Sequence, residues 1–209
     1  IFYDFYKDGN QRIRTVFGPF PSLKLGITQS LEVEVSLAPF VTAEFEDTSK
    51  GNSKSTQGVS DLYLSLKYNL WGNDGGPSAV ALIPYIKVPT AKDGLGNGAT
   101  EGGILLPIRF NLPNDVSIDI STEIDFFKNE LSEGYHLNYD NSIGITIPLI
   151  KNVYTSYEID SEVDVDPSSR VYNLLSFDVA AAWIVMPNLQ LDAGIDFGLT
   201  PDTSKIQVY

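Results

Sequence analysis

The sequence has no cysteine and no long hydrophobic run. Without cysteine it can form no disulfide, thiolate nucleophile or cysteine-bound metal site. No segment approaches about 18 consecutive apolar residues, so a transmembrane helix is excluded. Basic residues are also scarce, with 14 Lys plus Arg against 27 Asp plus Glu. This acidic balance argues against a nucleic-acid partner. The length of 209 residues suits one domain over residues 1–209.

Glycine and aromatic residues are frequent, with 17 Gly, 11 Tyr and 11 Phe. The stretch "DLYLSLKYNL" alternates strictly from Asp61 to Leu70, which indicates a β-strand because successive side chains leave opposite faces. No helical periodicity of useful length is found, and alternating runs follow one another along the chain. We predict twelve strands: 1–6, 13–28, 31–46, 58–71, 78–90, 102–112, 115–129, 135–149, 153–166, 171–186, 189–200 and 205–209.

The connections between these strands alternate in length. Longer ones, such as "DTSKGNSKSTQ" and "TAKDGLGNGATE", are followed by tight ones, such as "PN" and "IKN". Transmembrane barrels have short periplasmic turns and longer extracellular loops, whereas a soluble meander has no reason to shorten one rim. The alternation favours a membrane barrel, although "PSSR" and "GNDGGP" depart from it.

The two faces of the predicted strands differ in charge. In residues 31–45, 104–112, 116–126 and 189–199, every second side chain is uncharged and almost always apolar. Runs of about 11 residues are what a tilted strand needs to cross the hydrocarbon layer. In a soluble sandwich these apolar side chains would fill a core, and in a membrane barrel they would face lipid. The uniformly apolar face favours the barrel, because a sandwich would need a second apolar layer to cover it.

The acidic face then lines the lumen. We predict that these charged side chains point into it: Asp61, Lys67, Lys87, Arg109, Asp119, Glu123, Glu158, Asp160, Glu162, Asp178 and Asp192. If the chain enters from the periplasm, the strand directions also predict two aromatic belts at the membrane interfaces. The periplasmic belt comprises Tyr68, Trp71, Phe110, Tyr154 and Trp183. The outer belt comprises Phe45, Phe126, Tyr135, Tyr139, Tyr172 and Phe197.

Several motifs resemble those of a known family. "GVSDLYLSLKYNL", followed by "ALIPYIKVPTA" and the glycine-rich "DGLGNG", is similar to outer-membrane barrels grouped with phenol meta-pathway degradation and described as transporters. The matching positions are Gly58, Ser60, Asp61, Lys67, Tyr68, Lys87, Pro89 and Thr90. The resemblance implies a Gram-negative outer-membrane location and passage of small compounds, including aromatic or apolar ones. Such barrels end on a longer strand, so we expect the last strand to be truncated at Tyr209. Similarly, the absence of a signal peptide before Ile1 fits numbering that begins inside a mature chain.

Catalytic and metal sites have little support in the sequence. His136 is the only histidine, and Ser132 and Asp140 are near it in sequence, but proximity in sequence is no triad. Glu162, Asp164 and Asp166 alternate on one face without the spacing of a calcium loop. "DGLGNG" precedes no helix, so it is interpreted as a mobile loop rather than a phosphate site.

The sequence therefore predicts an all-β protein: a single antiparallel up-and-down transmembrane β-barrel of about 12 strands, in the bacterial outer membrane. The favoured function is a passive channel or transporter with a narrow acidic lumen. Its expected partners are the lipid bilayer and a small solute, and no cofactor is indicated. Two alternatives stay open, a non-transporting structural barrel and a soluble β-barrel that binds a small ligand.

Overall fold

The computed structural model describes residues 2–8, 11–18, 21–72, 75–169 and 171–209. Within this part of the chain there are fifteen strands in one antiparallel sheet and a single 3₁₀ turn, η1 (Pro113–Asp115). The strands are β1 (Phe2–Asp8), β2 (Gln11–Phe17), β3 (Ser22–Gly26), β4 (Leu31–Ser36), β5 (Val41–Asp47), β6 (Asn52–Gly58), β7 (Leu62–Trp71), β8 (Ser78–Val88), β9 (Glu101–Leu112), β10 (Val116–Lys128), β11 (Tyr135–Ile150), β12 (Val153–Asp164), β13 (Tyr172–Met186), β14 (Leu189–Gly198) and β15 (Ile206–Val208). No helix in the described segments is long and apolar enough to cross a bilayer.

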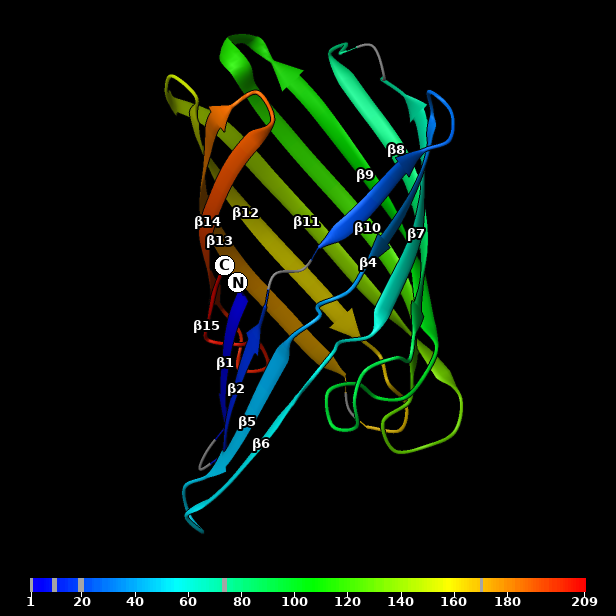
Figure 1. Ribbon diagram of the computed structural model, residues 1–209, viewed down its shortest axis with the longest axis vertical. Coiled ribbons are helices and arrows are strands. Elements are labelled where there is room, and N and C mark those ends of the chain that lie inside the picture. Colours follow the sequence, from blue (N-terminus) through cyan, green and yellow to red (C-terminus); the bar gives the residue numbers. More distant parts are fainter. Residues whose placement is uncertain (1, 9–10, 19–20, 73–74, 170) are drawn as a thin grey trace.

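The sheet curves into the wall of a barrel (Figure 1). From β7 to β15 each strand pairs with the next along the chain, and β15 pairs in turn with β1, for example at Tyr3 and Val208. The hydrogen-bonded order begins at β3 and ends at β6, so the ladder does not close into a regular ring. The antiparallel membrane-barrel fold predicted from the sequence is confirmed.

The strand count differs from the twelve that were predicted because long predicted strands are divided. Residues 13–28 contain most of β2 and all of β3, and residues 31–46 contain β4 and most of β5. Residues 52–57, expected to belong to an extracellular loop, instead form β6 together with Gly58, and β6 pairs with β5 from Gly58 opposite Val41 to Asn52 opposite Asp47. Only residues 48–51 are left as the turn of that hairpin.

A junction of irregular hydrogen bonds connects the divided strands. The amide of Gly18 donates to Phe40 O at 2.6 Å, and the amide of Ser60 donates to Ala38 O at 2.9 Å. Ser60 Oγ also accepts a hydrogen bond from the Ala38 amide at 2.7 Å. A Cβ on Gly18 would lie 2.9 Å from Phe40 O, so this close approach requires glycine. Three neighbouring segments thus stay joined where the regular ladder is interrupted.

The two rims of the barrel differ in the length of their connections. Tight turns, including the one at η1, lie at the upper rim in Figure 1. The lower rim carries the connections of residues 89–100, 129–134 and 199–205. We call these the short-turn rim and the long-loop rim. The predicted alternation of long and tight connections is therefore found in the connections that follow β8, whereas the predicted long connection "DTSKGNSKSTQ" is a hairpin with a short turn.

The polarity of the wall is opposite to that of a soluble protein. Hydrophobic side chains that are buried are few in the described ranges, and the four identified are Ala38, Val41, Val80 and Ala81. Many large hydrophobic side chains are instead exposed, among them Leu64, Leu66 and Ile143, the last at 53%. In β7 exposure alternates with the sequence, and Ser65, Lys67 and Asn69 are less exposed than their apolar neighbours. We call the exposed apolar side the outer face and the other side the inner face.

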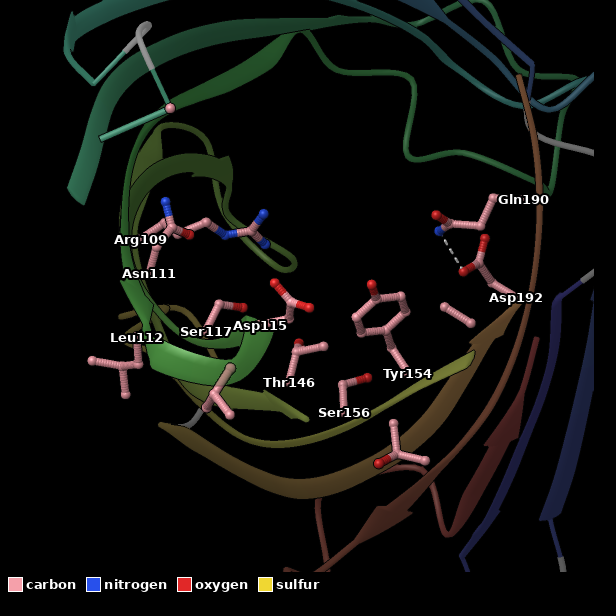
Figure 2. A pocket seen from close by; sticks show the side chains of 14 residues that line it. Arg109, Asn111, Leu112, Asp115, Ser117, Thr146, Tyr154, Ser156, Gln190 and Asp192 are labelled. Carbon is pink, nitrogen blue, oxygen red and sulfur yellow. Dashed lines mark hydrogen bonds between the residues drawn. The ribbon is translucent and has the colours of Figure 1, made fainter. Parts of the chain in front are cut away.

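Most of the predicted belt aromatics are exposed on the outer face. Tyr68, Trp71, Phe110 and Trp183 are exposed toward the short-turn rim, and Phe45, Phe126, Tyr135, Tyr139 and Phe197 toward the long-loop rim. The prediction is wrong for two tyrosines. Tyr154 lines a cavity on the inner face (Figure 2). Tyr172 is half-buried rather than exposed. It lies directly opposite Asp164, and its hydroxyl contacts Ser169 Oγ at 3.3 Å.

Candidate functional site

Lys87 is the centre of a buried cluster near the long-loop rim. Its Nζ forms an ion pair with Glu101, lies 3.5 Å from Asp61 Oδ2, and donates to Asn97 Oδ1 at 2.8 Å. Only 8% of Lys87 is exposed, and Asp61 and Glu101 are similarly buried. Strands β8 and β9 supply Lys87 and Glu101 from positions directly opposite each other. One ammonium is therefore shared by two carboxylates away from water, and with both acids ionised the cluster keeps one net negative charge.

The same cluster holds the connection between β8 and β9. Asp61 Oδ1 accepts a hydrogen bond from the Ala91 amide at 2.8 Å, and Asn97 Nδ2 donates to Glu101 Oε1 at 2.7 Å. Gly96 lies so close to Asp61 that a Cβ there would come within 2.7 Å of its Oδ2. The "DGLGNG" segment is thus anchored through Ala91 and Asn97, which argues against its interpretation as a mobile loop. The anchor uses Asp61 and Lys87, two positions of the motif found in the sequence.

Arg109 and Asp119 form a second ion pair, near the short-turn rim. Arg109 Nε and Nη2 donate to the two carboxylate oxygens of Asp119 at 2.6 and 3.1 Å. This bidentate geometry is the strong form of an arginine–carboxylate contact. Strands β9 and β10 place the two residues directly opposite each other.

A cavity of about 600 Å³ opens beside this pair (Figure 2). Figure 2 shows Arg109, Asp115, Tyr154 and Gln190 pointing into a common space that the curved wall encloses. Gln190 Nε2 donates to Asp192 Oδ1 at 2.7 Å. Asp192, predicted as a lumen residue, therefore lies at the short-turn mouth of the barrel.

Carboxylates on the inner face form two rows across neighbouring strands. Glu123 on β10, Asp140 on β11 and Glu162 on β12 lie directly opposite one another in register. A second row joins three further residues in the same way: Glu158 on β12, Asp178 on β13 and Asp196 on β14. Asp160 lies between the rows, opposite Ser142 and Ser176. We call these seven residues the acidic rows.

The acidic rows have no basic counterpart in the described part of the chain, where no lysine or arginine forms an ion pair with them. Among the bases predicted on the inner face, Lys67 is the one without an ion pair in the described residues. It lies on β7 opposite Glu32. Like charges placed directly opposite each other destabilise a sheet, and burying them unpaired would cost far more. In their ionised form the rows therefore require water or mobile cations beside them.

His136 lies in a third cluster, which connects two long loops. Its Nδ1 is 3.0 Å from Asn129 Oδ1, and its Nε2 is 2.9 Å from Asp164 Oδ1. Nδ1 therefore forms a hydrogen bond with Asn129 and Nε2 faces the Asp164 carboxylate, and in the described residues neither ring nitrogen contacts a serine hydroxyl. Ser132 contacts Asn129 Nδ2 instead, and Asp140 lies in the acidic rows. The residues near His136 in sequence do not form a triad.

Asp166 completes the contact between these loops, which we call the loop dock. Its Oδ2 accepts a hydrogen bond from the Glu130 amide at 2.7 Å, and its Oδ1 accepts from the amide and hydroxyl of Ser168, both at 2.7 Å. Asp164 and Asp166 thus serve the dock, whereas Glu162 lies opposite Asp140. The three carboxylates do not converge on one point, and no metal-binding group is found in the described residues.

The loop dock is expected to weaken in acid. Burial would raise the pKa of Asp166, but hydrogen bonds from Glu130 and Ser168 and the nearby His136 outweigh it and lower the pKa below its ordinary value. A lowered pKa means that the stabilisation is complete above the ordinary value and is lost as the pH falls through the lowered one. Hydrogen exchange of residues 129–134, corrected for intrinsic rates, should therefore accelerate below about pH 4.

Asp166→Asn is the control for this measurement. The variant keeps one acceptor oxygen but has no charge to lose, so exchange in residues 129–134 should show no acid step. An acid step of equal size in the variant would show that another group controls the dock.

Comparison with known proteins agrees with this architecture. The family model described as "Putative MetA-pathway of phenol degradation" matches residues 13–208. The chain belongs to this family. The resemblance inferred from the "GVSDLYLSLKYNL" and "IKVPT" motifs is thereby confirmed, and the structure shows that these motifs build the Lys87 cluster. No curated protein matches the chain.

Solved structures share the fold at low sequence identity. The COG4313 outer membrane channel from Pseudomonas putida F1 is 14% identical, with a TM-score of 0.67 over 99% of this chain and 90% of that one. The NanC porin is 7% identical, with a TM-score of 0.63 over 99% and 95%. The translocator domain of the autotransporter NalP from Neisseria meningitidis is 9% identical, with a TM-score of 0.54 over 99% and 82%. These three structures are a channel, a porin and a translocator domain.

Sequence reasoning missed several residues of these clusters. Glu101 and Asn97 were assigned to a loop, although Glu101 continues the two-residue period of Gly103 and Leu105 and could have been found by it. The partnership of His136 with Asp164 and Asp166 carried no comparable signal, because it joins the start of β11 to the end of β12 and the connection after it.

Proposed function

We propose that this chain is a passive outer-membrane channel for small neutral and cationic solutes. The observation that carries the proposal is the pair of acidic rows, which cross three strands each without an ion pair to any lysine or arginine of the described residues. The outward apolar face supports a lipid environment, and the family and the fold of the solved channels support the location. An apolar face of this extent opposes the alternative of a soluble ligand-binding barrel.

The acidic rows act through their combined field. Carboxylates on the wall of a narrow passage concentrate cations and repel anions, because low-dielectric walls focus the field within the passage. Nine of the eleven predicted lumen residues take one of two roles in this proposal. Asp61, Lys87, Arg109 and Asp119 are neutralised in ion pairs that stiffen the wall, whereas Glu123, Glu158, Asp160, Glu162 and Asp178 supply the net negative charge. The long-loop rim faces outside the cell, as in other transmembrane barrels.

Conductance in planar bilayers tests the proposal. In a KCl gradient the wild-type reversal potential should report a preference for K⁺. A triple variant, Glu158→Gln, Asp160→Asn and Glu162→Gln, should lower the permeability ratio of K⁺ to Cl⁻ by roughly twofold or more. The wild-type preference should also weaken near 1 M salt, where the screening length falls to about 3 Å.

A matched variant removes three carboxylates from the loops instead: Asp93→Asn, Glu130→Gln and Glu133→Gln. It changes the net charge equally but leaves the acidic rows intact, so the permeability ratio should stay close to wild type. Anion selectivity of the wild type, or equal effects of the two variants, would contradict the proposal.

A second candidate function is a non-transporting structural barrel. The anchored connection at Lys87 and the loop dock at His136 favour it, because both hold long loops in place at the same rim. A folded protein that shows no conductance in bilayers, with or without an applied potential, would favour this candidate over the channel.

A further inference from the structure

An apolar and aromatic patch interrupts the polar inner face of β7, β8 and β9. Ile83 and Leu105 lie directly opposite each other, and both line a cavity of about 720 Å³. Tyr63 and Tyr85 line the same cavity, with ring centroids 6.2 Å apart and planes tilted by 35°. Leu95, from the anchored connection after β8, adds to the lining. A cavity of this size lies within the range of about 300–1,000 Å³ that is typical of small-molecule sites.

The Tyr85 ring is held in a fixed orientation. Its hydroxyl donates to Asp125 Oδ1 at 2.7 Å, and Asp125 Oδ2 accepts a second hydrogen bond from Asn138 Nδ2 at 3.3 Å. A Cβ at Gly103 would overlap Asp125 and come within 2.9 Å of Tyr85 Cε1, so the glycine makes this arrangement possible. An aromatic surface that is oriented in advance loses little entropy when a ligand binds.

The charge around the cavity is negative, and its one ammonium is already neutralised. Glu34, Asp61 and Glu123 line the cavity against the single cation Lys87. Lys87 is engaged by Asp61 and Glu101, and Glu34 lies 3.3 Å from Lys24 Nζ. Glu123 is the lining carboxylate without an ion pair to a described base, and it lies directly opposite Leu105 of the apolar patch.

The geometry points to a binding site for a small organic cation that carries an aromatic or alkyl group. The ammonium would lie beside Glu123 and the tyrosine faces, where cation–π attraction adds to the charge. The hydrophobic part would pack against Ile83, Leu105 and Leu95. An inorganic cation would make no use of the apolar patch, and an organic anion would meet net negative charge. This inference rests on the proposed function, because it names a class of solute for the same lumen.

Calorimetry on the protein in zwitterionic nanodiscs tests the site, with empty nanodiscs as the blank. The probe is phenyltrimethylammonium, compared with tetramethylammonium and benzenesulfonate. Phenyltrimethylammonium should bind at least about fivefold more tightly than tetramethylammonium, because the ring adds apolar and aromatic contact. Benzenesulfonate has the same ring and the opposite charge, and it should not bind detectably.

Two pairs of variants locate the site. Glu123→Gln should weaken phenyltrimethylammonium binding roughly tenfold. Asp160→Asn also removes one carboxylate of the acidic rows, but Asp160 does not line the cavity. This control should change binding less than about twofold. Tyr63→Leu should weaken binding severalfold, and Tyr63→Phe should retain it because the ring is kept. Equal effects of Glu123→Gln and Asp160→Asn, or equal binding of the cation and the sulfonate, would overturn the inference.

These measurements do not depend on conduction. A barrel that binds phenyltrimethylammonium with the predicted pattern but does not conduct would refute the channel and support the site. A barrel that conducts cations without binding the probe would refute the site alone. If a variant fails to fold, the comparison of the three probes on the wild type still decides the matter.

Discussion

Lys87→Met is expected to lower the free energy of unfolding by about 3–5 kcal/mol. The substitution removes the one cation from a cluster in which Asp61 and Glu101 are 7% and 8% exposed. Two carboxylates would then be buried without a partner, which is the costly way to break a buried ion pair. Guanidinium unfolding from lipid vesicles, followed by the fluorescence of Trp71 and Trp183, measures the change.

A combined variant tests whether uncompensated charge causes this loss. Lys87→Met combined with Asp61→Asn and Glu101→Gln should recover most of the lost stability. The new side-chain amides carry no charge but keep an acceptor oxygen for the backbone amides of Ala91 and Lys128 and for Asn97 Nδ2. Lys67→Met is the single-site control, since this half-buried lysine of β7 should contribute at most about 1 kcal/mol. A loss below about 1 kcal/mol for Lys87→Met would mean that water hydrates the cluster.

Ile143→Arg is expected to cost about 2–4 kcal/mol of folding free energy in a bilayer. Ile143 lies at the middle of β11, is 53% exposed on the outer face, and has Ile120 and Ile159 as its register neighbours. If this face meets hydrocarbon, a guanidinium there has no water or counter-ion near the bilayer midplane. The same vesicle unfolding assay measures the effect.

Ser142→Arg is the matched control, because residue 142 precedes Ile143 on the same strand and faces inward. An arginine there lies opposite Asp160 and gains an acidic neighbour, at the expense of the 2.9 Å contact between the hydroxyls of Ser121 and Ser142. We expect a change within about 1 kcal/mol. If Ser142→Arg destabilises the barrel as much as Ile143→Arg does, the outer face is not the lipid face.

Alternation was sufficient to predict the long strands but not their interruptions. In residues 31–46 the apolar period continues through Leu37, Pro39 and Val41, so the sequence shows one strand where the structure has β4 and β5. The interruption results from hydrogen bonds between Gly18, Ala38, Phe40 and Ser60, residues that are distant in the chain. In β6 the reverse occurs: "NSKSTQG" has turn-like composition and no apolar face, yet pairing with β5 makes it a strand.

For the candidate site too, one part could be predicted from the sequence and another part could not. The sequence predicted that the acidic side chains share one face with Lys87 and Arg109. The face to which a strand side chain points depends only on the two-residue period. Which of them pair could not be predicted, because strand register and loop placement decide it. Lys87 is opposite Glu101 only through the register of β8 and β9, and Asn97 reaches it only because Asp61 holds the loop at Ala91.

By itself, the sequence determined the fold class, the inside-out polarity of the wall and the long and short rims, since each depends on local alternation and turn composition. Tertiary structure alone decided which charges are neutralised and which stay free. Glu123, Asp140 and Glu162 come from three strands, as do Glu158, Asp178 and Asp196, and only the antiparallel register places them side by side. A charge on one strand has no fixed neighbour until that register forms, because Coulomb interactions depend on distances that the linear chain does not set.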